Sequence, residues 1–357
     1  MPKFLIVACA MLVCGRGIVQ AQPHTIIAHS QGEATVFELD PVSGKILHQL
    51  KVSGQPHEGA ITSDAKTIFV SIPGSAHVVM IDADTFQEKG KVESEFFKRS
   101  PQSRPAAEDG RPRPPNTSAS PHGVAVTEDG EKLYVGVENA DIPGLVVYDL
   151  KNGRTLKKID LLLTGGHIFA IQPKTGKLYY PHKEDERVVV IDTKTDKIVK
   201  LIPVKGGPRG IAFAPNGEVW FHEDGDGSVT VVDSKTDDVV KVIPTAGKGI
   251  GRIAVSPDGS FAASTHDQTL DVTVIDTRTK TVVKTIPVGS GKNPSAALKI
   301  MYPMFSPDSS KLYVMNPSDG DITVIDVKQW TIAGRHKALT TTFGGVLRSP
   351  RAAGTQD

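Results

Sequence analysis

One residue recurs at a nearly constant interval along the chain and constrains its fold more than any other feature. An aspartate closes a short run of β-branched residues in seven places: Asp40, Asp82, Asp149, Asp192, Asp233, Asp276 and Asp326. Successive differences are 42, 67, 43, 41, 43 and 50 residues, so the period lies in the low forties with one large and one small insertion. A repeat of this length is typical of the blades of a β-propeller.

The strand content of each copy supports this interpretation. In the fifth copy, turn residues separate four predicted strands at 210–214, 218–222, 228–233 and 239–243. The first copy, 25–52, lacks a first strand, and the segment FGGVLRSP at 343–350 has the pattern of the missing one. The sequence therefore predicts an all-β, seven-bladed β-propeller with four antiparallel strands per blade. The ring is closed by the C-terminal strand, which joins the N-terminal blade so that no sheet edge is left open.

The ends of the chain have a different composition. Residues 1–21 carry Lys3, an apolar run and the small-residue site Val19-Gln20-Ala21, which predicts an export signal peptide and a periplasmic or secreted protein. Cys14 leaves a lipoprotein as the alternative. Cys9 and Cys14 are the only cysteines, so the mature protein has no disulfide and no thiolate site. Residues 22–350 form the single propeller, and 351–357 are predicted to be a disordered tail.

The large insertion at 94–120 is rich in Pro, Arg and Ser and has no hydrophobic periodicity. Such a segment predicts a long excursion, and its functional interpretation is a lid-like loop. A smaller excursion at 290–300 lies at the equivalent place in the seventh copy and therefore on the same face of the disc. The formal net charge of +1 gives no general attraction to nucleic acid or to a membrane surface. We expect no nucleic-acid partner, no membrane span and a monomer.

The repeats resemble the YVTN family of β-propeller repeats, a group that also takes in lactonase-like propellers. The resemblance covers nearly the whole mature chain. It is carried by five stretches: Pro121-His122-Gly123-Val124-Ala125-Val126, Lys132-Leu133-Tyr134-Val135, Ser256-Pro257-Asp258-Gly259, Leu312-Tyr313-Val314-Met315-Asn316 and Ile322-Thr323-Val324-Ile325-Asp326. It implies the propeller fold, and it says little of function because such folds host many activities. The family's usual Asn at the end of the second strand is kept at Asn316, and several other copies depart from it.

Those departures are histidines. Seven of the 11 histidines fall at two register positions, the end of the second strand and the start of the first. The first set is His29, His182, His222 and His266, and the second is His57, His122 and His167. Arg209 stands at the register of the second set and Arg252 one residue later, while the seventh blade offers Tyr302 and Asn316. Because these two positions share a face in a four-stranded blade, we expect all these residues to converge on one mouth of the central channel.

A metal site is the first interpretation of this set. Neutral imidazole is a common ligand of Zn, Cu and Ni, and a nitrogen-rich set without thiolates favours one of these three metals over Ca or Mg. Carboxylates follow in sequence as further ligands, second-shell partners or bases: Glu58, Glu184, Glu223, Asp224 and Asp267. The alternative is that each histidine is an ordinary hydrogen-bonding residue and that the Asn position tolerates His.

The same mouth suggests a reaction. Arg209, Arg252 and Asn316 are candidates for binding a small anionic or sugar-like ligand. His122 or Glu58 could move a proton, and Tyr302 could donate to a leaving group, which suits a metal-dependent, lactonase-like hydrolase or a lyase. No phosphate-binding loop and no nucleophile elbow is present in the sequence. The competing hypothesis is a non-catalytic propeller that serves as a docking platform for protein or polysaccharide.

Overall fold

The computed structural model of the chain describes residues 24–97, 121–137, 143–161, 168–291, 300–338 and 342–349. The predicted signal peptide, most of the 94–120 insertion, His167 and the 351–357 tail lie outside the described residues. The predictions made for them stay predictions.

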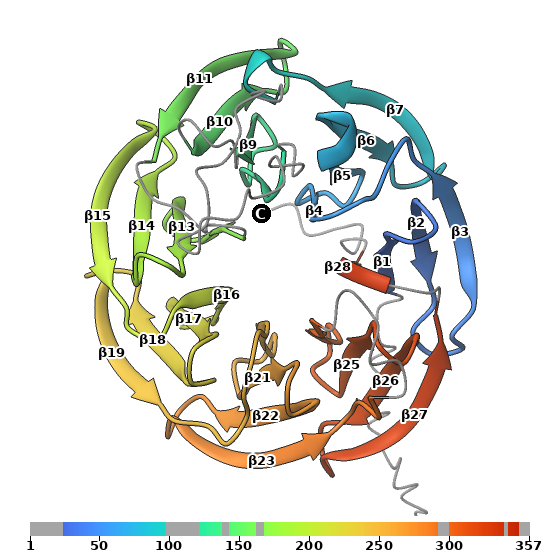
Figure 1. The fold of residues 1–357 in the computed structure, drawn as a ribbon, viewed down its shortest axis with the longest axis vertical. Coiled ribbons are helices and arrows are strands. Elements are labelled where there is room, and N and C mark those ends of the chain that lie inside the picture. The colour runs from blue at the N-terminus through green and yellow to red at the C-terminus, as the bar shows by residue number, and fades with distance from the viewer. Residues whose placement is uncertain are drawn as a thin grey trace, which may run out of the picture.

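Seven four-stranded antiparallel sheets stand side by side in a ring, which confirms the predicted seven-bladed propeller (Figure 1). Seven short strands form the inner edges: β4 (Gly59–Ile61), β8 (Val124–Val126), β12 (Ala170–Ile171), β16 (Pro208–Phe213), β20 (Ile253–Val255), β24 (Tyr302–Phe305) and β28 (Thr342–Arg348). The second strands are β1 (Thr25–Ser30), β5 (Thr67–Ile72), β9 (Lys132–Val137), β13 (Lys177–His182), β17 (Glu218–Glu223), β21 (Phe261–His266) and β25 (Lys311–Asn316).

The third strands are almost entirely buried, and the fourth strands form the rim. The third strands are β2 (Thr35–Leu39), β6 (His77–Asp82), β10 (Gly144–Asp149), β14 (Arg187–Asp192), β18 (Val229–Asp233), β22 (Asp271–Asp276) and β26 (Asp321–Asp326). The outer strands are β3 (Ile46–Lys51), β7 (Gln87–Val92), β11 (Arg154–Asp160), β15 (Lys197–Pro203), β19 (Asp238–Ile243), β23 (Thr281–Pro287) and β27 (Thr331–Lys337). In the fifth blade the predicted boundaries differ from these by no more than two residues. No helix in the described ranges is long and apolar enough to cross a bilayer.

The recurring aspartate is explained by the turn that follows the third strand. In each blade its carboxylate accepts hydrogen bonds from backbone N–H groups two or three residues further on, for example from Val42 to Asp40 at 2.8 Å and from Lys235 to Asp233 at 2.7 Å. The residue four positions after the aspartate then adopts a positive φ, as Asp237 does at 57°. Asp is favoured at such a turn because its side chain bonds its own backbone.

The ring is closed by the C-terminal strand. β28 pairs antiparallel with β1, so the first blade is built from both ends of the chain. Arg348 fixes this strand through an ion pair of 3.2 Å with the buried Glu38 and a second with Asp84 of the next blade. Burial alone would raise the pKa of Glu38, but hydrogen bonds from Thr25, His48 and Arg348 lower it overall. The carboxylate therefore stays ionised and holds the closing strand.

Positive-φ turn residues also join neighbouring blades. Asp237, from the turn of the fifth blade, accepts bonds from Lys177 Nζ at 2.6 Å and Tyr179 Oη at 2.5 Å in the fourth blade. Asp196 makes the same two contacts with Lys132 and Tyr134 one blade earlier. One blade later the charges are reversed: Lys280 pairs with Glu218 at 2.8 Å and lies 6.0 Å from the ring centroid of Trp220.

We expect Asp237→Ala to lower the free energy of unfolding by about 3 kcal/mol, because it leaves the half-buried Lys177 without its counter-ion and the Tyr179 hydroxyl without its strongest acceptor. Urea unfolding followed by circular dichroism measures the change. Asp238→Ala is the matched control, since the neighbouring Asp238 carboxylate is exposed and pairs with Lys200 at the surface. Equal effects of the two variants would contradict the prediction.

Candidate functional site

The predicted binding and catalytic residues other than Asn316, which ends β25, lie where the inner strands begin. His57 and Glu58 directly precede β4, and Arg252 directly precedes β20. Arg209 is the second residue of β16, and Tyr302 is the first of β24. These residues come from the second, fifth, sixth and seventh blades, so contacts among them must reach around or across the axis of the ring.

Three of them form a compact polar cluster. The hydroxyl of Tyr302 donates to Glu58 Oε1 at 3.3 Å, and Arg252 Nη2 donates to the same hydroxyl at 3.1 Å. Arg252 Nη2 also lies 3.7 Å from Glu58 Oε1, and its guanidinium carbon lies 4.9 Å from the ring centroid of Tyr302. We call these three residues the axial cluster. Glu58 belongs to the second blade and Arg252 to the sixth, so the cluster spans the ring.

His57 and His122 extend this cluster. Their ring centroids are 3.8 Å apart, and His57 Nδ1 lies 3.7 Å from Glu58 Oε1. His122 is 7 % exposed and packs on His57, which lies beside the carboxylate. Of the three predicted proton-transfer residues, Glu58 and Tyr302 are in direct contact, and His122 is linked to them through the ring of His57.

The electrostatics of the axial cluster follow from burial and from its own charges. Burial would lower the pKa of Arg252, but Tyr302 and Glu58 raise it overall, so the guanidinium is charged. Burial raises the pKa of the Tyr302 hydroxyl, and the opposing effect of Arg252 does not reverse this. Tyr302 is therefore protonated at neutral pH and can act as a hydrogen-bond donor or a general acid.

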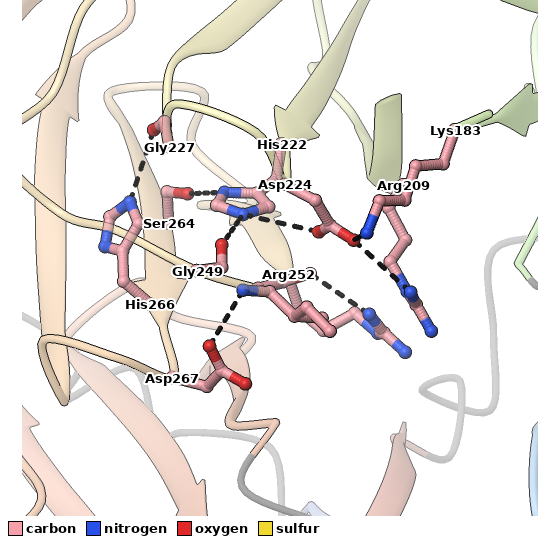
Figure 2. Close-up of polar contacts among 12 residues, drawn as sticks. Lys183, Arg209, His222, Asp224, Gly227, Gly249, Arg252, Ser264, His266 and Asp267 are labelled. Carbon is pink, nitrogen blue, oxygen red and sulfur yellow. Dashed lines mark hydrogen bonds and ion pairs between the residues drawn. The ribbon is translucent and has the colours of Figure 1, made fainter. Parts of the chain in front are cut away.

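A second group of charges lies beside the cluster. Asp224 Oδ2 lies 3.3 Å from both Arg209 Nη1 and Lys183 Nζ (Figure 2). The close-up in Figure 2 draws this group next to Arg252 of the axial cluster. Together they hold three permanent cations, Lys183, Arg209 and Arg252, against two carboxylates, Glu58 and Asp224.

Both arginines retain a buried donor that is not used. Within the described part of the chain, neither Arg209 Nε nor Arg252 Nε has a hydrogen-bond partner. The guanidinium ends of the two side chains lie in the same part of the close-up in Figure 2. An unsatisfied buried donor costs about 1–3 kcal/mol, and more on a charged group, so this arrangement favours an added acceptor.

His222 and His266 are occupied by the protein. Both are fully buried between the fifth and sixth blades, with ring centroids 5.2 Å apart. His222 Nδ1 bonds the Ser264 hydroxyl at 2.9 Å and its Nε2 bonds the Gly249 carbonyl at 3.0 Å. His266 bonds Asp271 at 2.9 Å and the Gly227 carbonyl at 3.3 Å. Burial, followed by His266, lowers the pKa of His222 to about 4, so its ring is neutral.

The remaining members of the predicted set make their described contacts with residues other than Glu58, Arg252 and Tyr302. His29 is fully buried, and its Nδ1 donates to the His57 carbonyl at 2.9 Å. Burial lowers its pKa to about 4. His182 packs on Tyr180 with ring centroids 4.5 Å apart. Asn316 donates to Asp321 and Thr323 of its own blade at 2.6 and 2.7 Å, so its amide nitrogen serves the fold.

The predicted metal set includes residues that the structure describes, and among the described residues no three His, Cys, Asp or Glu side chains are grouped so that they could hold a metal ion. The hydrogen bonds of His222 and His266 make these two the poorest candidates. His29 fits better, since Nδ1–H faces a backbone carbonyl and a neutral ring then has its lone pair on Nε2, as in many metal-bound histidines. The zinc, copper or nickel prediction stays a prediction.

Two residues that hold site residues in place, Lys183 and Ser264, were not predicted from the sequence. Lys183 shares the Asp224 carboxylate with Arg209, and Ser264 fixes the ring of His222. Neither stands at one of the two register positions that carry the histidines. Their signal is indirect: Lys183 directly follows a second-strand histidine, and Ser264 lies two residues before one.

The chain is thus a seven-bladed β-propeller with an arginine-rich polar cluster on the axis. No family model matches it, and no curated protein matches it in sequence. Many solved structures share the fold. Hydrazine synthase of Kuenenia stuttgartiensis is 19 % identical over 79 % of this chain and 86 % of its own, with a TM-score of 0.64.

Two further structures cover more of this chain. A functionally unknown protein from Desulfotomaculum acetoxidans DSM 771 is 16 % identical, covers 91 % of this chain and 99 % of its own, and has a TM-score of 0.71. The dihydro-heme d1 dehydrogenase NirN, solved in complex with DHE, is 15 % identical over 93 % of this chain and 77 % of its own, with a TM-score of 0.62. At these identities the likeness concerns the fold alone.

Proposed function

We propose that this propeller binds a small anionic, sugar-like ligand at the axial mouth, between Arg209 and Arg252, and acts on it as a hydrolase or lyase. The observation that carries the proposal is the pair of arginines whose buried Nε donors have no acceptor among the described residues. Arginine is suited to this task because its planar fork matches a carboxylate or phosphate. Three cations against two carboxylates also leave a net positive charge for the ligand to neutralise.

The catalytic part rests on the Glu58 and Tyr302 pair. Tyr302 is a protonated donor that already bonds Glu58 Oε1 at 3.3 Å, so a proton has a defined path between a phenol and a carboxylate. In an elimination from a uronate, Glu58 or His122 would take the proton next to the carboxylate, and Tyr302 would protonate the leaving oxygen. In hydrolysis of a lactone, the same groups would activate water and protonate the ring oxygen.

Isothermal titration calorimetry with D-glucuronate and D-glucose tests the binding step. These two sugars differ in the carboxylate, so we expect glucuronate to bind and glucose to bind at least about tenfold more weakly, as loss of one charge-assisted contact implies. Arg209→Gln should weaken glucuronate and leave glucose unchanged. Equal affinity for both sugars, or no heat from a panel of uronates, aldonates and phosphate, would overturn the proposal.

Turnover is tested separately. Ultraviolet absorbance follows the double bond formed by uronate elimination, and pH-stat titration follows lactone opening. Tyr302→Phe keeps the ring beneath Arg252 and removes the proton, so we expect kcat to fall by about 100-fold or more with KM nearly unchanged. Binding without turnover on either substrate class would leave a binding protein and remove the catalytic part.

The transition-metal part of the hypothesis is proposed for the first three blades, where His57 and His122 are adjacent and His29 bonds the His57 carbonyl. Zinc, copper or nickel there would polarise a ligand carbonyl. We expect plasma mass spectrometry of tag-free protein to find stoichiometric metal that His57→Ala/His122→Ala loses and that His336→Ala, on outer strand β27, retains. Absence of metal from all three proteins after reconstitution would remove the metal from the proposal.

Export is proposed from the predicted signal peptide. Cleavage after Ala21 would give a mature protein beginning at Gln22. Intact mass of the protein recovered from a bacterial periplasmic fraction measures this directly. A full-length mass, or a lipid-modified Cys14, would contradict it.

A docking platform is the second candidate function, and one observation favours it. The outer strands of three consecutive blades expose apolar side chains, which are Ile198, Val199 and Leu201 on β15, Val239, Val240 and Val242 on β19, and Val282 and Val283 on β23. Exposed apolar groups on a sheet edge are a typical protein-interaction surface. Val240→Lys would weaken such an interaction and leave glucuronate binding unchanged.

A further inference from the structure

His222 differs from an ordinary buried histidine because its ring contacts groups that hold both Arg209 and Arg252 in place. Its Nε2 lies 3.0 Å from the Gly249 carbonyl, in the loop that leads to Arg252. The same atom lies 3.7 Å from Oδ1 of Asp224, the counter-ion of Arg209. Figure 2 shows dashed lines from this ring to both the Gly249 carbonyl and Asp224.

The hydrogen bonds define the tautomer of His222. A carbonyl oxygen accepts and never donates, so the proton must be on Nε2, which faces Gly249. Nδ1 is then the acceptor and receives the hydroxyl hydrogen of Ser264 at 2.9 Å. A ring that donates at one nitrogen and accepts at the other is fixed in orientation.

Two glycines allow the strands to approach closely around this ring. A Cβ on Gly251 would lie 2.9 Å from both Cε1 and Nε2 of His222. A Cβ on Gly210, the residue after Arg209, would lie 3.0 Å from the Cα of Arg252 and 3.2 Å from the Cβ of His222. The Gly251 carbonyl in turn accepts from Arg252 Nη1 at 3.0 Å. The backbones that carry the two arginines are therefore packed against each other and against His222.

A nucleophilic triad is a different interpretation of Ser264, His222 and Asp224, and the geometry excludes it. Ser264 and His222 are fully buried, so no substrate reaches the hydroxyl. A triad histidine accepts the serine proton on one nitrogen and donates to the aspartate from the other at hydrogen-bond distance. Here the donor nitrogen bonds a backbone carbonyl, and the aspartate is 3.7 Å away.

We infer that His222 is a positioning residue that sets the spacing of the Arg209 and Arg252 guanidinium groups and hence the affinity of the anion site. This inference rests on the proposed function, in which the two arginines bind the anion. His222→Ala removes the hydrogen bond to the Gly249 carbonyl and so loosens the loop that contains Gly251, whose carbonyl accepts from Arg252 Nη1. His222→Gln retains a donor that reaches the Gly249 carbonyl.

Calorimetry with D-glucuronate on wild type, His222→Ala, His222→Gln and His336→Ala tests the inference. We expect about a tenfold loss of affinity for His222→Ala, the loss expected from removing one buried hydrogen bond, and near wild-type affinity for His222→Gln and His336→Ala. Gly210→Ala should weaken binding as well, because its methyl group separates the two arginine-bearing strands. Unchanged affinity in His222→Ala, or equal losses in the Ala and Gln variants, would overturn it.

Two nuclear magnetic resonance measurements need no ligand and separate a failure of this inference from a failure of the proposed function. Nitrogen shifts of the His222 ring should report a proton on Nε2 and no titration between pH 5.5 and 8. Hydrogen exchange at Arg252 Nε should quicken several-fold in His222→Ala and stay unchanged in His336→Ala. If the wild-type protein binds no anion, the proposed function fails, and the exchange rate at Arg252 Nε still shows whether His222 positions Arg252. A proton on Nδ1 of His222, or an exchange rate that is unchanged in His222→Ala, refutes the positioning role.

Discussion

Arg252→Gln is expected to abolish measurable glucuronate binding, with a loss of affinity of at least about 100-fold. Arg252 is 5 % exposed, and its Nε donor is free of described partners, so a carboxylate at this point would be desolvated and strongly held. Its removal also takes away the guanidinium that lies 3.7 Å from Glu58 Oε1. The Glu58 carboxylate would then repel an anionic ligand more strongly. Calorimetry measures the effect.

Two variants show whether the fork or the charge matters. Arg252→Lys keeps a cation but has no Nε donor and no planar face for Tyr302, so we expect it to recover only part of the affinity. If Arg252→Gln alone is unstable, the double variant Arg252→Gln/Glu58→Gln takes its place, because it removes both charges together and is expected to keep the fold. Arg335→Gln, at an exposed ion pair on β27, is the control and should bind normally. Wild-type affinity in Arg252→Gln would rule out the axial arginine site.

The fold could be predicted because its repeat is fixed by local chemistry. Each aspartate accepts backbone N–H groups in its own turn, and the residue four positions later takes a positive φ in every blade: Gly44, Phe86, Gly153, Asp196, Asp237, Lys280 and Trp330. Such a turn needs no distant partner, so its sequence signal survives the divergence of the blades. Ring closure was also visible because the first copy lacked a strand that the C-terminus supplied.

The direction of the histidine side chains could not be read from the strand ends alone. His266 stands ten residues before its aspartate, as Asn316 does, whereas His29 and His222 stand eleven before theirs. Since neighbouring residues of a strand point to opposite sides, one residue of offset reverses the side chain. His222 from the fifth blade and His266 from the sixth therefore face each other across one crevice. Grouping them under one register concealed this difference.

The same count identifies the axial residues more sharply than the histidine pattern did. Glu58, Arg209, Arg252 and Tyr302 each lie 24 residues before the aspartate of their blade. Glu58, Arg252 and Tyr302 occupy one structural position in three blades, and the structure brings them into contact. Arg209 lies one residue earlier in its blade, at the irregularity between Pro208 and Gly210, because the first turn of the fifth blade is one residue shorter. Counting residues along the sequence does not predict the contact across the ring, because the curvature of the seven packed blades determines which blades face each other.

Glu223→Gln is expected to change how stability depends on pH. Glu223 is fully buried, and neither carboxyl oxygen makes a hydrogen bond with the residues that the structure describes. Burial raises its pKa to about 9; Asp226, Asp224 and Glu186 act in the same direction, and Thr230 opposes them. The side chain packs on Gly206, where an added Cβ would lie 3.2 Å from the Cβ and 3.5 Å from Oε2 of Glu223.

The direction in which stability changes with pH follows from the difference in proton binding between the folded and unfolded states. Below the ordinary pKa of a glutamate the folded and unfolded states are both protonated at this position, and the group has no effect. Between that value and about 9 only the unfolded state ionises, so Glu223 lowers the stability of wild type by about 1.4 kcal/mol per pH unit as the pH rises. Glutamine cannot ionise, so the variant lacks this loss, and its advantage should grow by about 3 kcal/mol between pH 5 and pH 7.5.

Urea unfolding of wild type and Glu223→Gln at half-unit steps from pH 5 to pH 8.5 measures this difference. Glu88→Gln, at an exposed position on β7, is the matched control and should run parallel to wild type. A constant offset between wild type and Glu223→Gln would mean that the carboxyl is ionised in the folded protein and that a cation, or a residue outside the described ranges, compensates it. A growing advantage would establish a neutral acid sealed between the fourth and fifth blades, one residue before Asp224, the carboxylate that holds Arg209 at the site.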